Sequence, residues 1–165
     1  MATKEDYNAF LETVRKQTGL NLLVPDEFGF ISVLVQDEYN THLQFIESTG
    51  KILLFVEILS LPKDAGKAVY RDLLAGMLFG VDSAGGFFSL EPETETVIYN
   101  YLFDFDKVAA DPNVFISTFE DIFTLMDVWK DRIREKLSSQ DGEESAEPIN
   151  PDNIQSNSRE FIIQA

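Results

Sequence analysis

The sequence contains no cysteine, and histidine occurs only once, at position 42. Disulfides, thiolate nucleophiles and zinc or iron–sulfur centres with thiolate ligands are therefore excluded, and a reducing compartment is the natural setting for such a chain. A single histidine also excludes a metal site with two histidine ligands. We predict that His42 is an ordinary strand or surface residue, because a Ser–His–acid triad here would lack the Gly-x-Ser-x-Gly elbow.

Motifs for phosphate, cofactor and metal binding are also lacking. No Gly-x-Gly-x-x-Gly occurs, and Gly85-Gly86 is not followed by the Lys-Ser/Thr of a phosphate-binding loop. Acidic pairs such as Glu93 and Glu95 are typical of a solvated surface rather than of a glycosidase. The sequence thus predicts no catalytic residue, no cofactor and no metal, and a protein that is not an enzyme.

Long apolar runs are missing as well. The longest, residues 52–61, contains Glu57 and is too short to cross a bilayer. The N-terminus shows no basic segment followed by an apolar run, which is the pattern of a signal peptide. We therefore expect a soluble, cytoplasmic protein that does not insert into membranes.

Basic residues are scarce relative to acidic ones. Thirteen Lys and Arg against 29 Asp and Glu give a formal net charge of −16. Such a charge repels polyanions, which makes nucleic acid and anionic membranes poor partners. Self-repulsion would also hold down aggregation if apolar residues were exposed for binding. An ordinary acidic cytoplasmic protein is an equally good interpretation of the charge by itself.

The chain does contain enough apolar material for a core. Its 165 residues are 44% hydrophobic, which favours a single folded domain. Hydrophobic periodicity and turn signals predict helices over residues 5–18, between Asp64 and Gly80, and over residues 112–137, and strands over residues 28–36, 41–48, 51–60, 87–90 and 96–104. The order α-β-β-β-α-β-β-α predicts an α+β fold, a twisted and mainly antiparallel sheet packed with three helices.

The predicted domain spans residues 1–137. Residues 138–165 are rich in acidic residues, Ser, Asn and Pro and show no periodicity, so they are expected to form an acidic, largely flexible tail. The apolar cluster Phe161-Ile162-Ile163 is the exception. The sequence leaves open whether this cluster has no role or forms a strand on a sheet edge of this chain or a neighbour.

Three predicted strands, residues 28–36, 51–60 and 96–104, carry large apolar residues on both faces. An antiparallel sheet that is covered on one side normally alternates apolar and polar residues. Three helices are too few to cover both faces, so burial of the second face favours a partner or a second copy of the chain. The alternative is a monomer in which the helices and the tail cover both faces.

The first predicted helix carries an apolar stripe of Tyr7, Phe10, Leu11 and Val14. Packing on the core is the ordinary role of such a stripe. A short amphipathic helix beside an open sheet edge also forms a groove for an extended peptide, which is held by main-chain pairing and side-chain pockets.

Several local features combine with the element order, the small size and the acidity. They are Thr18-Gly19-Leu20 at the end of the first helix, Phe28-Gly29-Phe30 at the first strand, Leu61-Pro62 after the third, Tyr70-Arg71-Asp72-Leu73-Leu74-Ala75-Gly76 followed by Gly85-Gly86, and the helix over residues 119–129. In these features residues 6–137 resemble the class I type III secretion chaperones, the Tir-chaperone (CesT-like) family.

The resemblance implies a homodimer that binds the N-terminal chaperone-binding segment of a secreted effector or translocated protein. The client would be kept extended, soluble and competent for secretion, and the secretion ATPase is a further partner that the resemblance suggests. The first helix and strands within residues 28–60 would hold the client, through Tyr7, Phe10, Leu11, Val14, Phe30, Leu43, Phe45 and Phe55. The second helix and the strand over residues 96–104 would form the dimer interface, through Leu74, Met77, Leu78, Tyr99, Tyr101 and Phe103.

A YbjN-like regulatory or interaction protein of related fold, acting outside secretion, is the alternative hypothesis. Gene neighbourhood separates the two, because a chaperone gene commonly lies beside its client or the secretion apparatus. Either face of the predicted sheet could serve the dimer, with the other serving the client.

Overall fold

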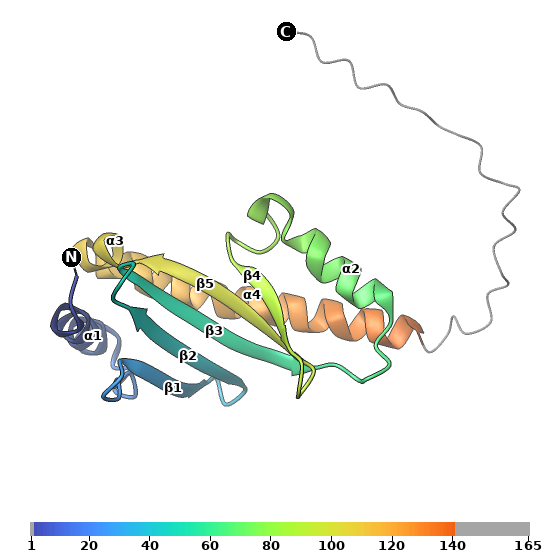
Figure 1. The fold of residues 1–165 in the computed structure, drawn as a ribbon, viewed down its shortest axis with the longest axis horizontal. Helices are drawn as coiled ribbons and strands as arrows, with labels where there is room; N and C mark the ends of the chain where they lie inside the picture. The colour runs from blue at the N-terminus through green and yellow to red at the C-terminus, as the bar shows by residue number, and fades with distance from the viewer. Residues whose placement is uncertain (1, 141–165) are drawn as a thin grey trace, which may run out of the picture.

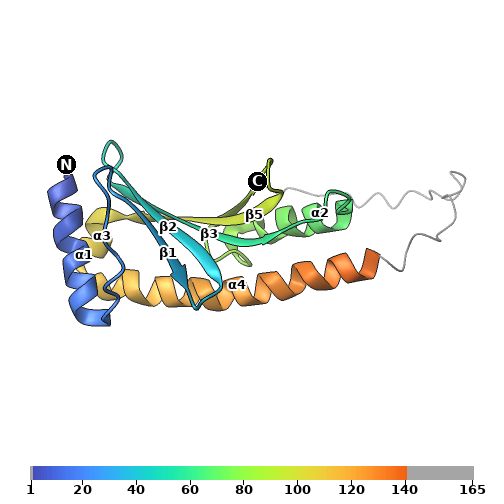
Figure 2. The same ribbon diagram turned by 90° about the horizontal axis from the view of Figure 1, so that it is seen from below.

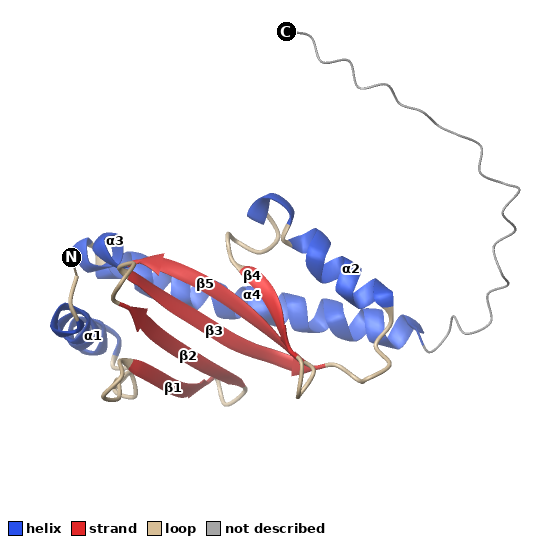
Figure 3. Cartoon of the chain, in the orientation of Figure 1, coloured by secondary structure: helices blue, strands red, loops and turns tan. Residues whose placement is uncertain are grey.

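The computed structural model describes residues 2–140 of the chain. Its sheet consists of β1 (Phe30–Val35), β2 (Tyr39–Ile46), β3 (Lys51–Ser60), β4 (Phe87–Glu91) and β5 (Thr96–Asp104). All neighbouring strands are antiparallel and their order is β1-β2-β3-β5-β4, so β1 and β4 form the two edges (Figures 1 and 3). The predicted α+β class and antiparallel sheet are confirmed.

Helix α1 (Lys4–Thr18) lies where the sequence predicts the first helix. Thr3 caps it: its hydroxyl accepts the amide hydrogen of Asp6 at 3.2 Å, and the Asp6 carboxylate accepts that of Thr3 at 2.9 Å. This reciprocal pair satisfies two amides that have no partner within the helix. Gly19 ends the helix at φ 74°, a left-handed conformation that glycine adopts without strain.

The second predicted helix is shorter than expected. Helix α2 (Lys67–Gly76) follows Gly66 rather than a cap at Asp64, and a separate 3-10 turn, η1 (Leu78–Gly80), occupies the predicted last turn. Trp129 of the last helix lies against Gly76, which leaves no room there for a side chain. Only glycine fits at this last residue of α2.

The long predicted helix is α4 (Pro112–Gln140), which begins at the predicted Asp111-Pro112 signal. It extends three residues beyond Leu137, so residues 138–140 are helical. Residues 141–165, with the apolar cluster at 161–163, lie outside the described part of the chain.

A short helix, α3 (Phe105–Ala110), was not predicted. It follows β5 without a break, and Asp104 caps it by accepting the amide hydrogen of Lys107 at 3.4 Å. Only Phe105 and Val108 are buried in it, which is too few residues to produce a detectable helical period.

Burial alternates along β3: Ile52, Leu54 and Val56 are buried, whereas Leu53 and Phe55 on the opposite face are half-buried. Figure 2 shows α4 running along one face of the sheet, with α1 and α3 at one end and α2 at the other. No helix within residues 2–140 covers the other side, which we call the open face. Strand register assigns to it Phe30, Ser32, Leu34, Asn40, His42, Gln44, Leu53, Phe55, Glu57, Phe87, Ser89, Ile98, Asn100 and Leu102.

The core lies between the sheet and α4. The predicted stripe of α4 is buried, with Phe115, Phe119, Ile122, Met126, Trp129 and Ile133 at most 6% exposed. Phe115 packs against Phe10 of α1 and Phe103 of β5, with ring centroids 5.3 and 4.8 Å apart. Full burial of a side chain of this size contributes about 1.5–3 kcal/mol, so this stripe is a main source of stability.

A buried lysine fixes the β1–β2 hairpin to α4. Lys130 Nζ lies 2.5 Å from the Glu38 carboxylate and donates to Tyr39 Oη at 2.9 Å, while Tyr39 Oη donates to Asp127 at 2.6 Å. Burial and the bond to Asp127 raise the pKa of Tyr39. The bonds to Glu38 and Tyr39 outweigh the burial of Lys130 and raise its pKa. Removing one partner from such a buried network is costly, so the hairpin is held firmly.

None of the helices between residues 2 and 140 combines the length and the apolar composition that a membrane span requires.

Candidate functional site

Most of the residues predicted to bind a client are buried in the core. Tyr7 of α1 stacks on Phe45 of β2 with ring centroids 4.9 Å apart, and Phe10 contacts Phe105 and Phe115. The stripe of α1 is therefore used to dock this helix on β2, α3 and α4. Six of the eight residues are at most 6% exposed, namely Tyr7, Phe10, Leu11, Val14, Leu43 and Phe45, and cannot contact a partner in this conformation.

Phe30 and Phe55, the other two predicted client-binding residues, lie on the open face. His42 stacks between them, with its ring 5.5 Å from Phe30 and 4.6 Å from Phe55. Strand register places His42 and Phe55 in a row with Asn100 and Phe87. The row crosses the sheet from β2 to the edge strand β4 and gives the open face an aromatic band.

Apolar residues flank this band on the same face. Leu53 pairs with Leu102, which is 48% exposed, and Leu34 of β1 is 53% exposed. Asn100 within the band donates to the Phe87 carbonyl and to Ser89 Oγ, so its amide is satisfied by the sheet itself. The open face therefore presents aromatic rings and aliphatic side chains to a partner.

The charges around the open face are almost all negative. Glu57 lies on it, 3.5 Å from His42 Nε2, and accepts a hydrogen bond from Asn40 at 2.9 Å. Residues 30–60 and 87–104 contain eight acidic residues and one basic residue, Lys51, which pairs with Asp104 at 2.8 Å. The hydrogen bond from Lys51 lowers the pKa of Asp104. This surface complements a partner segment that combines apolar and basic residues.

Strand β1 is an open edge beside an apolar loop. It pairs only with β2 among the strands of residues 2–140. Asp26 of the preceding loop already binds the amide and the carbonyl of Phe30, so an added strand would pair with β1 beyond Phe30. The loop that precedes it exposes Leu22, Val24 and Phe28 at 61–75%. A cleft of about 130 Å³ between the ends of α1 and α4 lies nearby, lined in part by Leu20 and Phe119. The sequence reasoning missed Leu22 and Val24, although large apolar residues outside any predicted element were a visible signal. Phe28 was assigned to the first predicted strand and instead lies in the turn before β1.

A second apolar surface lies at the other end of the molecule, on α2 and η1. Leu74, Leu78, Phe79 and Val81 are 63–90% exposed. Beside them an apolar groove of about 180 Å³ separates α2 from β4, lined by Tyr70, Leu73, Leu74, Met77, Phe88, Ser89, Leu90 and Val97. We call these four exposed residues and the groove the α2 surface. Residues 73–81 carry no charge, a pattern that the sequence reasoning did not use.

The residues predicted for a dimer interface divide between this surface and the core. Leu74 and Leu78 are exposed on the α2 surface, and Met77 lines its groove while its sulfur accepts the amide hydrogen of Phe88. Tyr101 is half-buried on the helix-covered side of the sheet. Tyr99 and Phe103 are at most 3% exposed in the core, and burial raises the pKa of Tyr99.

The α2 surface is anchored to α4 through Arg132. The Arg132 guanidinium binds both carboxylate oxygens of Asp72, at 2.6 and 2.7 Å, and lies over the Trp129 ring at 4.5 Å. The hydrogen bond to Asp72 raises the pKa of Arg132. Trp129 Nε1 donates to the Asp82 carbonyl at 2.9 Å, and Tyr99 Oη donates to that of Ser83 at 2.8 Å. The turn after α2 therefore has a defined position.

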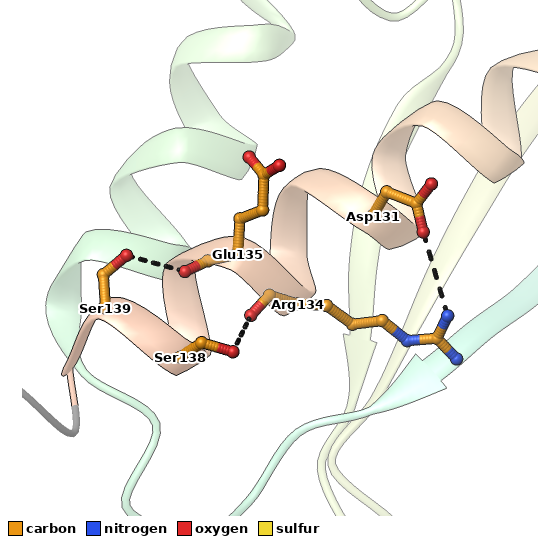
Figure 4. Close-up of a pocket in the computed structure, with 5 residues that line it drawn as sticks. All are labelled: Asp131, Arg134, Glu135, Ser138 and Ser139. Atoms are coloured by element: carbon orange, nitrogen blue, oxygen red, sulfur yellow. Dashed lines mark hydrogen bonds and ion pairs between the residues drawn. The ribbon is translucent and has the colours of Figure 1, made fainter.

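A hollow beside the last turns of α4 is lined mainly by polar and charged residues (Figure 4). Ser138 and Ser139 donate to carbonyls of their own helix, and Arg134 pairs with Asp131 at 3.8 Å. These side chains are satisfied within one helix and do not converge on a common point. Residues 2–140 also contain no group of three or more His, Asp or Glu that could hold a metal ion.

The structure is an α+β domain with one uncovered apolar sheet face and a second apolar surface at its end, features that are typical of interaction sites. The family model of the Tir chaperone protein (CesT) family matches residues 9–129, and the chain belongs to this family. A comparison with curated protein sequences finds no match.

Solved structures share the fold. A chain of the crystal structure of the ExsC–ExsE complex is similar with a TM-score of 0.68 and 18% identity, over 79% of this chain and 95% of that one. A chain of the HopA1–SchA chaperone–effector complex has a TM-score of 0.60 and 19% identity, over 80% and 95%. The Yersinia pestis type III secretion chaperone SycH, in complex with a fragment of YscM2, has a TM-score of 0.54 and 20% identity, over 72% and 98%.

Proposed function

We propose that this protein is a cytoplasmic type III secretion chaperone. It binds the N-terminal chaperone-binding segment of an effector or translocated protein and keeps that segment extended, soluble and competent for secretion. The observation that carries the proposal is the uncovered apolar face of the sheet in a member of the Tir chaperone protein family. Similar folds in the HopA1–SchA and SycH–YscM2 complexes support it, because those proteins are chaperones with a protein bound.

The client segment is expected to use the open face and the β1 edge. An extended chain can pair its backbone with β1 and place alternate side chains on the rings of Phe30 and Phe55. Glu57 and the acidic hairpin turns would then meet basic residues of the client. The stripe of α1 supports this site from the core side and does not contact the client.

The protein is further proposed to act as a homodimer through the α2 surface, where Leu74 and Leu78 lie exposed. A highly acidic chain needs an uncharged surface for close self-association, and residues 73–81 supply one. Two subunits would double the surface offered to a single extended client. The secretion ATPase is a further partner, which would receive the loaded complex.

Capture of the client from the native cytoplasm tests this function. Tagged full-length chain should recover a protein that is exported by a type III apparatus, and deletion of that protein's N-terminal segment should abolish recovery. Phe55→Asp on the open face should lose the client, whereas Val128→Asp, on an exposed position of α4, should retain it. Recovery of non-exported proteins alone would contradict the proposal and favour a regulatory role.

A further inference from the structure

Phe79 combines full exposure with an unfavourable backbone. Its side chain is 90% exposed, and its φ and ψ of 58° and 7° lie in the left-handed region. Residues with a β-carbon rarely adopt this conformation, because the β-carbon approaches the carbonyl oxygen. A large apolar side chain held in this way on a surface has no stabilising role in the monomer that would offset its strain. Such positions are concentrated at functional sites.

The turn around Phe79 is held from both sides. The Gly80 amide donates to the Met77 carbonyl at 3.0 Å, and the Gly85 amide donates to that of Gly80 at 2.9 Å. Trp129 and Tyr99 donate to two carbonyls further along the turn, those of Asp82 and Ser83. The phenyl ring is therefore presented to the outside by a backbone with a defined position.

The groove between α2 and β4 has room for one such ring. Its volume is about 180 Å³, and apolar cavities of roughly 150 Å³ bind benzene. Tyr70, Leu74, Met77 and Leu90 contribute apolar atoms to its lining. Because Phe79 is exposed, it does not fill the groove of its own chain.

The occupant that fits best is a second copy of the chain. The folded body and the tail both carry net negative charge, and residues 73–81 form an uncharged segment between Asp72 and Asp82. Uncharged segments are where two such acidic copies approach with least repulsion, and residues 73–81 are an uncharged segment that borders the groove. The projecting ring and the receiving groove belong to the same surface, which is the self-complementarity that a twofold dimer requires.

We infer that Phe79 of each subunit inserts into the α2–β4 groove of the partner subunit. The inference rests on the proposed homodimer and specifies the contact that holds it. Each groove is completed only by the other copy, so Phe79 is a determinant of dimer affinity. The strain at Phe79 is offset on association, when its ring leaves water.

Cross-linking tests the geometry, because the chain has no native cysteine. Phe79→Cys and Leu90→Cys chains are co-expressed with different tags, and the mixed species is treated with a short bifunctional maleimide. We expect rapid cross-linking between the two variant chains and much slower cross-linking of either variant with itself. A wild-type protein that sediments as a monomer at micromolar concentration would contradict the dimer itself. A dimer without the mixed cross-link would contradict only the insertion of Phe79.

A second variant separates a binding role from a structural one. Asn tolerates the left-handed conformation, so Phe79→Asn should raise the denaturant midpoint of the monomer. It should also raise the dimer dissociation constant about tenfold or more, as truncation of an interface aromatic does. Val128→Asn, at another exposed apolar position, should leave the dissociation constant unchanged. An unchanged dissociation constant in Phe79→Asn would overturn the inference.

Discussion

Gly76 and Trp129 approach so closely that a β-carbon on Gly76 would lie 2.2 Å from Cη2 of the indole ring. The last turn of α2 therefore rests directly on the Trp129 ring of α4, with no side chain at position 76 between them. Gly86 meets Tyr99 in the same manner, with a β-carbon position 2.3 Å from the phenol oxygen. Gly76 and Gly86, two glycines of the pattern that resembles the family, thus have the same physical role, because each lets its backbone approach a buried aromatic ring.

Gly76→Ala should destabilise the protein by about 1–3 kcal/mol, because the new methyl group overpacks the core against Trp129. The free energy of unfolding in urea measures this change. Trp129→Leu in the same chain removes the overlapping ring, so in that background Gly76→Ala should cost much less and can become favourable through helix propensity. Equal costs in the two backgrounds would show that the contact is not the cause.

Arg132→Ala should weaken both the fold and the α2 surface, because it removes two hydrogen bonds to Asp72 and the contact with Trp129. We expect a loss of about 1–2 kcal/mol in unfolding free energy. Arg132→Lys should recover only part of it, since an ammonium cannot bind a carboxylate through two parallel hydrogen bonds. Arg134→Ala, at an exposed position on the same helix, is the control and should change stability by less than about 0.5 kcal/mol.

Phe45 and Phe55 lie on adjacent strands, but their replacement by Asp should have different consequences. Phe45→Asp should disrupt the fold, and Phe55→Asp should disrupt client binding. Phe45 is buried against Tyr7 and Phe105, so a carboxylate there should cost more than about 3 kcal/mol and unfold much of the protein. Phe55 lies on the open face, and its replacement should leave the circular dichroism spectrum unchanged while client capture is lost. Retention of the client by folded Phe55→Asp protein would argue against the open face as the binding site.

Asp104→Asn should lower stability in a pH-dependent way. Lys51 lowers the pKa of Asp104 in the folded state, so the ion pair contributes above the ordinary carboxyl pKa and is lost as the pH falls through the lowered value. Asn still caps α3, so the substitution isolates the charge. The urea midpoints of wild type and variant should differ at pH 7 and converge only as the pH falls through the lowered pKa of Asp104, which lies below the ordinary carboxyl value of about 4. Lys51→Gln should show the same convergence, and a difference that persists in acid would rule out the ion pair as its cause.

Local periodicity was sufficient to predict the elements with many buried contacts. The stripe of α4 and the span of β3 agree with the sequence pattern. Side chains on one face recur every three to four residues in a helix and every two residues in a strand, so the spacing of apolar residues identifies the element. The six-residue helix α3 escaped prediction because two buried residues do not establish a period.

Site residues were harder to predict than elements. Sequence pattern identified the apolar stripe of α1 but not its partner, and Tyr7 and Phe10 turned out to pack on β2, α3 and α4. Phe30 and Phe55 were expected to bind a client and are accessible to one, since they lie on the face that no described helix covers. Phe79 was missed because its exposure and its strained backbone are not visible in a string of apolar residues.

The sequence by itself determined the α+β class, the antiparallel hairpins, the excess of negative charge and the presence of more apolar surface than the predicted helices can cover. These properties depend on composition and on contacts between residues that are near in the chain. Only the tertiary structure decided which apolar surface remains accessible. The insertion of β5 between β3 and β4, and the docking of α1 and α4 on one face, join residues that are distant in the chain. Long-range packing of this kind buries one apolar residue and exposes another of the same type, and no local pattern distinguishes the two.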